Sequence, residues 1–183
     1  MTTDTQPASV YDLAHDEEPE NLATFAVLVD NEPGVLHRLV GLFAARGYNI
    51  ESLTVAETDR RAHTSRVTIV TRGTPHVLSQ IEAQLEKMVS TRHVQDVTRD
   101  PNGLERELAL VKVRCSGADR VEALRVSEIF RAKVIDTTHE SFVFEVTGAS
   151  SKIDSFIELM RPLGLAEVSR TGVLSIQRGA RAL

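Results

Sequence analysis

The alternation of apolar and polar positions predicts six regular elements in the first half of the chain. A run that is apolar on both faces predicts a buried strand, and apolar residues at helical spacing from Leu36 to Phe43 predict an amphipathic helix. Alternating stretches then predict a pair of strands, and Thr74-Pro75 provides a cap and first-turn proline for a second helix. In order, we expect a strand at 25–29, a helix between Gly34 and Gly47, strands at 49–57 and 65–71, a helix with its apolar face over 78–88, and a strand at 93–98.

The same order of elements begins again after the turn-forming sequence RDPNG at 99–103. Asp119 with Glu122, and Ser151 with Asp154, have the spacing of capping boxes and predict the starts of two helices. Strands are expected at 108–115, 134–138, 142–147, 165–169 and 173–177, the last two closing the sheet around Gly172. Each half thus has the strand order of a ferredoxin-like unit.

The sequence therefore predicts an α+β protein with two ferredoxin-like βαββαβ domains. The expected boundaries are a mobile acidic tail at 1–22, a first domain at 23–98, a linker at 99–107 and a second domain at 108–183. Only the first domain has an NEPG turn, at 31–34, so the two halves are expected to do different work.

The candidate site lies at the two ends of the first helix. The first turn of a helix presents unpaired N–H groups and a partial positive charge, and can therefore hold a carboxylate. Asn31 and Asn49 flank the helix, and each amide can both donate and accept hydrogen bonds. Together these groups suit a small zwitterion with an aliphatic side chain; the alternative is that both asparagines only form turns.

Composition and charge exclude several classes of protein. Apolar residues make up 42% and charged residues 26% of the 183 residues, which is ordinary for a globular protein. The net charge is −5 and no dense Lys/Arg cluster occurs, which argues against nucleic-acid binding. No apolar run approaches the roughly 20 residues of a membrane helix, and the acidic N-terminus resembles neither a signal nor a transit peptide. We expect a cytoplasmic protein with no membrane partner.

No catalytic constellation is recognisable. Six histidines are scattered without metal-ligand spacing, no nucleophile-elbow motif surrounds a serine, and the glycines form neither a phosphate loop nor a dinucleotide fingerprint. Cys115 lies on a strand of alternating pattern, where a cysteine is more often a small core residue than a reactive thiol. The chain is therefore expected to be a binding or regulatory module without a catalytic or metal site.

Several stretches carry a family resemblance. The turn NEPGVL, the run LFAARGYNIESLTV and the strand SRVTIVT resemble an ACT domain, and more closely that of the regulatory small subunit of acetohydroxyacid synthase (acetolactate synthase). In the second half, ERELALVKV, SEIFRAKVID and SRTGVLSIQRG are similar to the C-terminal domain of that subunit. The resemblance covers about residues 24–180.

The resemblance implies a regulatory function. Small subunits of this family bind a catalytic large subunit, raise its activity and confer feedback inhibition by valine in the synthesis of valine, leucine and isoleucine. Thiamine diphosphate, magnesium and FAD would belong to that partner, and no cofactor is expected in this chain. The family also implies a homodimer formed through the ACT domains. The alternative is a free-standing ACT-type amino-acid sensor.

The resemblance also places valine between the ACT domains of two subunits. One subunit would contribute Asn31 and Gly34, and the other Asn49 with Ile50. Backbone groups near Leu28 and Val35 would complete the site. Pro33 stands before the glycine and has no N–H, so the turn has one donor fewer toward the carboxylate.

Overall fold

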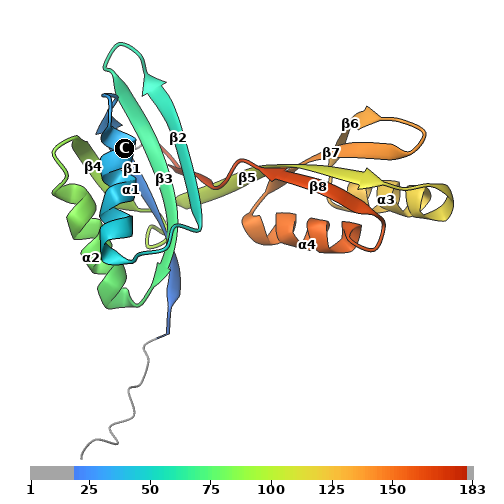
Figure 1. Cartoon of the computed structure of the whole chain (residues 1–183), viewed down its shortest axis with the longest axis horizontal. Helices are drawn as coiled ribbons and strands as arrows, with labels where there is room; N and C mark the ends of the chain where they lie inside the picture. Colours follow the sequence, from blue (N-terminus) through green and yellow to red (C-terminus); the bar gives the residue numbers. More distant parts are fainter. Residues whose placement is uncertain (1–18, 181–183) are drawn as a thin grey trace, which may run out of the picture.

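The computed structural model describes residues 19–180, which form two α+β domains side by side (Figure 1). Most of the expected tail at 1–22 therefore lies outside the described residues. The first domain has a four-stranded antiparallel sheet in the order β2-β3-β1-β4, which is the predicted ferredoxin-like arrangement. Its elements are β1 Asn21–Asp30, α1 Val35–Arg46, β2 Ser52–Asp59, β3 Thr64–Gly73, α2 Pro75–Glu86 and β4 Thr91–Asp96.

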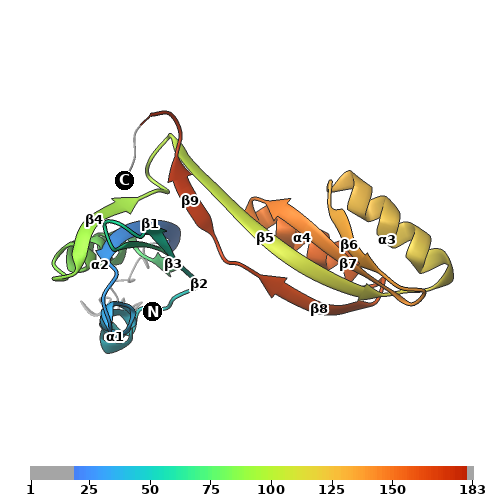
Figure 2. The same ribbon diagram turned by 90° about the horizontal axis from the view of Figure 1, so that it is seen from above.

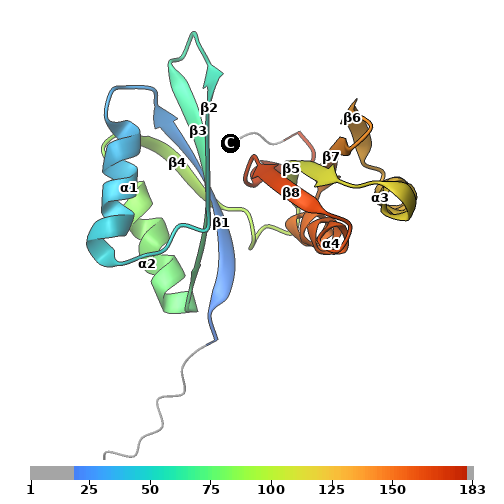
Figure 3. The same ribbon diagram turned by 45° about the vertical axis from the view of Figure 1, so that its right-hand side comes forward.

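Both helices of the first domain cover one face of its sheet (Figure 3). Leu39 and Phe43 of α1 and Ile81 of α2 are at most 1% exposed and pack on Phe25 and Ile69 from the strands. Each buried side chain of this size stabilises the folded domain by about 1.5–3 kcal/mol. The predicted start of α2 is confirmed, because Thr74 is its N-cap and accepts a hydrogen bond from the Val77 N–H at 3.4 Å.

The second domain has the sheet order β6-β7-β5-β8, again with two helices on one face. Its core contains Phe144, Ile153, Phe156 and Met160, all fully buried. The elements are β5 Gly103–Arg114, α3 Gly117–Ile129, β6 Lys133–Thr137, β7 Ser141–Gly148, α4 Ser150–Met160 and β8 Leu165–Arg170.

Both predicted capping boxes in this domain are wrong. The N-cap of α3 is Ser116, and Asp119 lies inside the first turn. There its negative charge interacts favourably with the positive end of the helix dipole. The N-cap of α4 is Ala149, so Ser151 already belongs to the helix and caps nothing. In both cases the helix begins earlier than the box spacing suggests. Residues before the predicted box, Ser116 and Ala149, take the N-cap position instead.

The expected linker at 99–107 is largely a strand. β5 begins at Gly103 and continues for 12 residues, about twice the usual length of a strand. Its first part pairs with β9 (Leu174–Gln177), from Gly103 opposite Gln177 to Arg106 opposite Leu174, while its second part lies in the main sheet of the second domain.

The last two strands therefore do not close one sheet as predicted. β8 pairs with the second part of β5, whereas β9 pairs only with the first part, between the two domains (Figure 2). Between β8 and β9 the chain passes through Gly172, whose φ of +79° is a conformation that favours glycine. This bend carries the chain out of the second sheet and toward the first domain.

Candidate functional site

The turn before α1 exposes a helix N-terminus. Gly34 is the N-cap with φ of +85°, and no side chain caps the helix. The Val35 N–H donates to the Glu32 carbonyl at 3.3 Å, so the next N–H groups, those of Leu36 and His37, are the ones that can face a ligand. The turn is anchored by backbone bonds from Asp30 N–H to Ser90 O at 2.9 Å and from Asn31 N–H to His63 O at 2.7 Å. It is thus a firmly held frame with unsatisfied donors.

A side-chain network supports the same turn. The Glu32 carboxylate accepts hydrogen bonds from Ser90 Oγ and Arg38 Nη2. The bond from Ser90 is the main cause that holds the pKa of Glu32 below its usual range; burial opposes it, and the bond from Arg38 adds to the lowering. Arg92 Nε donates to Asp30 Oδ1 at 2.6 Å. These acids already have cationic or hydroxyl partners, which leaves the helix N–H groups for another acceptor.

The other end of α1 is closed by Gly47, as predicted. The N–H of Gly47 bonds to Ala44 O and that of Tyr48 to Phe43 O. Asn49 follows, and its carbonyl accepts from Thr71 Oγ1 at 2.6 Å. The side chain of Ile50 is half-buried against the core. The chain then enters β2.

Both predicted asparagines are exposed, and each donates to a nearby carboxylate. Asn31 Nδ2 lies 3.2 Å from Glu57 Oε1, and Asn49 Nδ2 lies 3.1 Å from Glu51 Oε1. Each amide therefore keeps its Oδ1 as an acceptor. An ammonium group would find an amide oxygen and a carboxylate close together at either position.

Within one chain these predicted residues form two separate groups. Asn31, Gly34 and the buried Val35 lie at the N-terminal end of α1, near half-buried Leu28. Asn49 and Ile50 lie beyond its C-terminal end. A helix of 12 residues is ~18 Å long, so one subunit does not bring the two groups into contact. The assignment of these six residues to a ligand stays a prediction.

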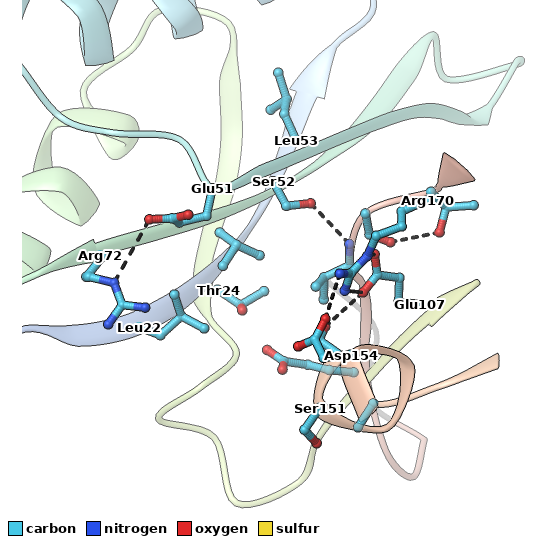
Figure 4. Close-up of a pocket in the computed structure, with 17 residues that line it drawn as sticks. Leu22, Thr24, Glu51, Ser52, Leu53, Arg72, Glu107, Ser151, Asp154 and Arg170 are labelled. Atoms are coloured by element: carbon cyan, nitrogen blue, oxygen red, sulfur yellow. Dashed lines mark hydrogen bonds and ion pairs between the residues drawn. The ribbon is translucent and has the colours of Figure 1, made fainter. Parts of the chain in front are cut away.

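A cavity of about 720 Å³ lies elsewhere, between the two domains (Figure 4). Glu107 is 4% exposed at its edge and accepts hydrogen bonds at 2.7 Å from both Nε and Nη2 of Arg170. Ser150 Oγ donates to Glu107 at 3.0 Å, and Arg170 Nη1 donates to Asp154 Oδ1 at 2.6 Å. The lining residues include Leu22, Thr24, Ser52, Leu53, Val70 and Val173.

The Glu107 cluster was not predicted from the sequence, which assigned that residue to a linker. The bonds from Arg170 hold the pKa of Glu107 below its ordinary value and raise that of Arg170, while burial opposes both shifts. The period of the strand could have indicated that Glu107 is buried. Glu107 precedes Ala109 and Val111 at a spacing of two and therefore shares their buried face. Because its lone pairs are filled, this carboxylate ties strands together and has no proton to exchange near neutral pH.

The described residues offer neither a metal site nor a reactive cysteine. Between residues 19 and 180, no three His, Cys, Asp or Glu side chains are grouped to hold a metal ion. Cys115 is buried, and burial raises the pKa of its thiol, so it is a core residue and a poor nucleophile. None of the helices in this part of the chain has the length and apolar content that crossing a bilayer requires.

Comparisons with known proteins agree in both halves of the chain. Residues 25–93 match the family model of the AHAS small subunit-like ACT domain, and residues 106–179 match that of the small subunit of acetolactate synthase. A probable acetolactate synthase small subunit from Archaeoglobus fulgidus is 46% identical over 156 residues, covering 85% of this chain and 96% of its own.

Two further relatives extend this likeness. The acetolactate synthase isozyme 3 small subunit of Escherichia coli is 44% identical over 159 residues, which covers 86% of this chain and 96% of the relative. The crystal structure of the acetolactate synthase small subunit from Thermotoga maritima superposes with a TM-score of 0.78 at 38% identity, covering 88% of this chain and 99% of that one.

Proposed function

Because this chain belongs to the family of acetolactate synthase small subunits, we propose that it activates a catalytic large subunit and makes it sensitive to inhibition by valine. It would do so in the cytoplasm, without cofactors of its own, since thiamine diphosphate, magnesium and FAD are expected on the partner. The observation that carries the regulatory proposal is the pair of half-sites at the ends of α1, one with open helix N–H groups and one with Asn49.

A homodimer would join these half-sites. Two α1 helices that pack across a twofold axis perpendicular to them run antiparallel, so the N-terminus of one lies beside the C-terminus of the other. Leu36 and Val40 are 40% and 37% exposed on one face of α1, and Val55 is 44% exposed on the edge strand β2. Gly41 lies on the same helix, and a Cβ added there would meet nothing within 4 Å in the described chain. These features support an interface with a second copy.

The chemistry of the joined half-sites suits valine. Its carboxylate would accept from the N–H groups at the start of α1, as anions do at helix N-termini. Its ammonium would donate to the amide oxygens of Asn31 and Asn49, with Glu57 and Glu51 close behind. Its isopropyl group would pack near Val35 of one subunit and Ile50 of the other. No charged side chain is needed to recognise the effector.

Regulation then follows by linkage. If valine binds one arrangement of the dimer more tightly, it shifts the population toward that arrangement, and the activating contact with the catalytic subunit weakens valine binding by the same factor. A coupling of about 1–3 kcal/mol changes affinity by roughly 5- to 150-fold.

Reconstitution with a catalytic subunit tests this proposal. Acetolactate formation is measured with and without this chain, across a range of valine concentrations. We predict that Asn31→Ala and Asn49→Ala retain activation and raise the valine concentration for half-inhibition by about tenfold or more, as expected for loss of a hydrogen bond to a charged group. Asn21→Ala, an exposed asparagine at the far end of β1, is the matched control.

The outcomes separate the alternatives. Full valine sensitivity in both site variants would refute the site. A chain that binds valine but never activates a catalytic subunit would instead be a free-standing amino-acid sensor.

A further inference from the structure

The second face of the ACT sheet is covered by the end of the chain. Figure 3 shows α1 and α2 on one side of this sheet and the second domain on the other. On that second face, Thr24 and Thr68 are 3% exposed and Ala26 is fully buried, although no helix of the ACT domain reaches them. The segment that approaches this face is residues 171–177, which we call the strap.

Polar contacts hold the strap to the ACT sheet. Thr54 Oγ1 donates to the carbonyl of Thr171 at 3.1 Å, and the N–H of Val173 donates to Ser52 Oγ at 3.2 Å. Farther along, Arg66 Nη2 donates to the carbonyl of Ser175 at 2.8 Å. These are side-chain bonds to a backbone, and breaking them leaves both domains intact.

The closest approach occurs at Gly172. A Cβ at this position would lie 2.4 Å from Ser52 Oγ and 2.9 Å from Thr54 Oγ1. The residue also has φ of +79°, which L side chains rarely adopt. Glycine is thus required twice, once by the backbone conformation and once by the neighbouring strand.

The contact is incompletely satisfied. Three buried polar atoms near it have no hydrogen-bond partner among residues 19–180: Arg66 Nε, Glu105 Oε1 and Ser175 Oγ. Glu105 is paired with Ser175 across β5 and β9, and Arg66 binds the Ser175 carbonyl. Burial lowers the pKa of the Arg66 guanidinium, which has no ion-pair partner in the described chain. The contact between the strap and the ACT sheet is therefore polar, and its groups can exchange protein partners for water when the strap separates.

The strap is connected directly to the proposed effector site. Ser52 follows Asn49 and Ile50 by only two or three residues, at the start of β2. The other end of the strap continues from β8, whose Arg170 binds the buried Glu107 of β5. A shift of the β2 start therefore reaches the strap through the side chains of Ser52 and Thr54, and the strap continues directly from β8 of the second domain.

We propose that the strap is a two-state latch that couples occupancy of the effector site to the orientation of the second domain. This inference rests on the proposed function for the identity of the effector. In the closed state, seen here, Ser52 and Thr54 hold the strap. In the open state the strap leaves the ACT sheet, and Arg66, Glu105 and Ser175 gain water as a partner. Valine changes the ratio of the two states because it binds beside the latch.

The first test measures the distance between the domains in the whole protein. Spin labels are placed at Glu86→Cys on α2 and Glu128→Cys on α3, both exposed, in a Cys115→Ala background. Labelled chains are diluted with unlabelled ones so that most dimers carry a single labelled chain. Gly172→Ala is expected to lengthen and broaden the distance distribution. Gly179→Ala is the matched control, because Gly179 has φ of +83° and its Cβ would meet nothing within 4 Å.

A gentler pair of variants guards against misfolding of Gly172→Ala. Ser52→Ala and Thr54→Val each remove one bond to the strap and keep the shape of β2. Both are expected to shift the distances in the same direction by a smaller amount. Distances that are identical in wild type, Gly172→Ala and Thr54→Val would overturn the latch.

The second test measures coupling in the reconstituted enzyme. Valine is expected to shift the wild-type distance distribution and to inhibit the enzyme. Thr54→Val should still activate the catalytic subunit, but its valine concentration for half-inhibition should differ from that of the wild type by at least about threefold. An unchanged valine response in variants whose distances have shifted would refute the coupling. If the wild-type enzyme ignores valine but Gly172→Ala and Gly179→Ala still differ in distance, the proposed effector is wrong and the interdomain contact stands.

Discussion

Replacement of the buried carboxylate Glu107 gives the sharpest test of how the second domain is held together. Glu107 joins β5 to β8 through Arg170 and to α4 through Ser150. Glu107→Gln keeps the shape but removes the charge and turns an N–H₂ toward donors that previously found an oxygen. The variant therefore leaves Arg170 with Asp154 as its remaining acid partner.

The magnitude follows from burial. Removing one member of a buried ion pair typically costs 3–5 kcal/mol. Here the Arg170 side chain is 35% exposed and keeps Asp154, so water and that acid recover part of the loss. We therefore expect the free energy of unfolding to fall by about 2–3 kcal/mol. With a urea m-value of roughly 1–3 kcal/mol/M, this lowers the midpoint by about 0.7–3 M.

The assay is urea unfolding followed by far-UV circular dichroism, because the chain has no tryptophan. Glu158→Gln is the matched control: Glu158 also pairs with an arginine, but its side chain is 66% exposed, and exposed pairs contribute about 0–1 kcal/mol. Equal losses in the two variants would refute the argument that burial makes the Glu107 pair important.

The effect also depends on pH in a defined direction. The pKa of Glu107 is lower in the folded protein than in the unfolded chain. Its contribution is therefore fully present above the unfolded value, about 4.3, and is lost as pH falls through the folded value. The stability difference between wild type and Glu107→Gln should be constant near neutrality and shrink below about pH 4. A difference that grows on acidification would show that the sign is wrong.

Two further predictions concern the surface and the core. Val40→Asp should weaken dimerisation by at least about tenfold in sedimentation experiments, because it places a charge on the proposed α1 interface. The control Val89→Asp changes a valine that is 96% exposed and should leave dimerisation unchanged. Equal dimerisation of the two variants would show that α1 is not in the interface. Cys115 should react with a thiol reagent at least about 100-fold more slowly in the native protein than in urea, because burial raises its pKa; rapid labelling without urea would contradict its place in the core.

The elements that were predictable are those with local causes. α1 follows from its apolar spacing and from Gly47, and α2 from Thr74-Pro75, all within a few residues of the helix they define. The ends of strands were harder to predict from the sequence. β1 starts at Asn21, four residues before the apolar run, because its ladder with β3 continues to Gly73. A partner strand 52 residues away decides that boundary, and no local pattern contains it.

The candidate effector site shows the same division. The sequence places Asn31 and Asn49 at opposite ends of α1, and the fold keeps them there. The hydrogen bonds from their amides to Glu57 and Glu51 were not foreseen, although Glu51 is only two residues from Asn49. Whether the two ends meet depends on a second subunit, which periodicity within one chain does not describe.

The interdomain features were missed because they break local rules. Glu107 is a charged residue in phase with buried ones, and the strap leaves a strand pattern that continues unchanged across Gly172. Both depend on residues far apart in the sequence, 63 positions for Glu107 with Arg170 and 117 for Thr54 with Thr171. A fold that needed only stability could use apolar side chains at such places. Both features lie between the ACT domain and the second domain, and sequences depart from local consistency chiefly where function demands it.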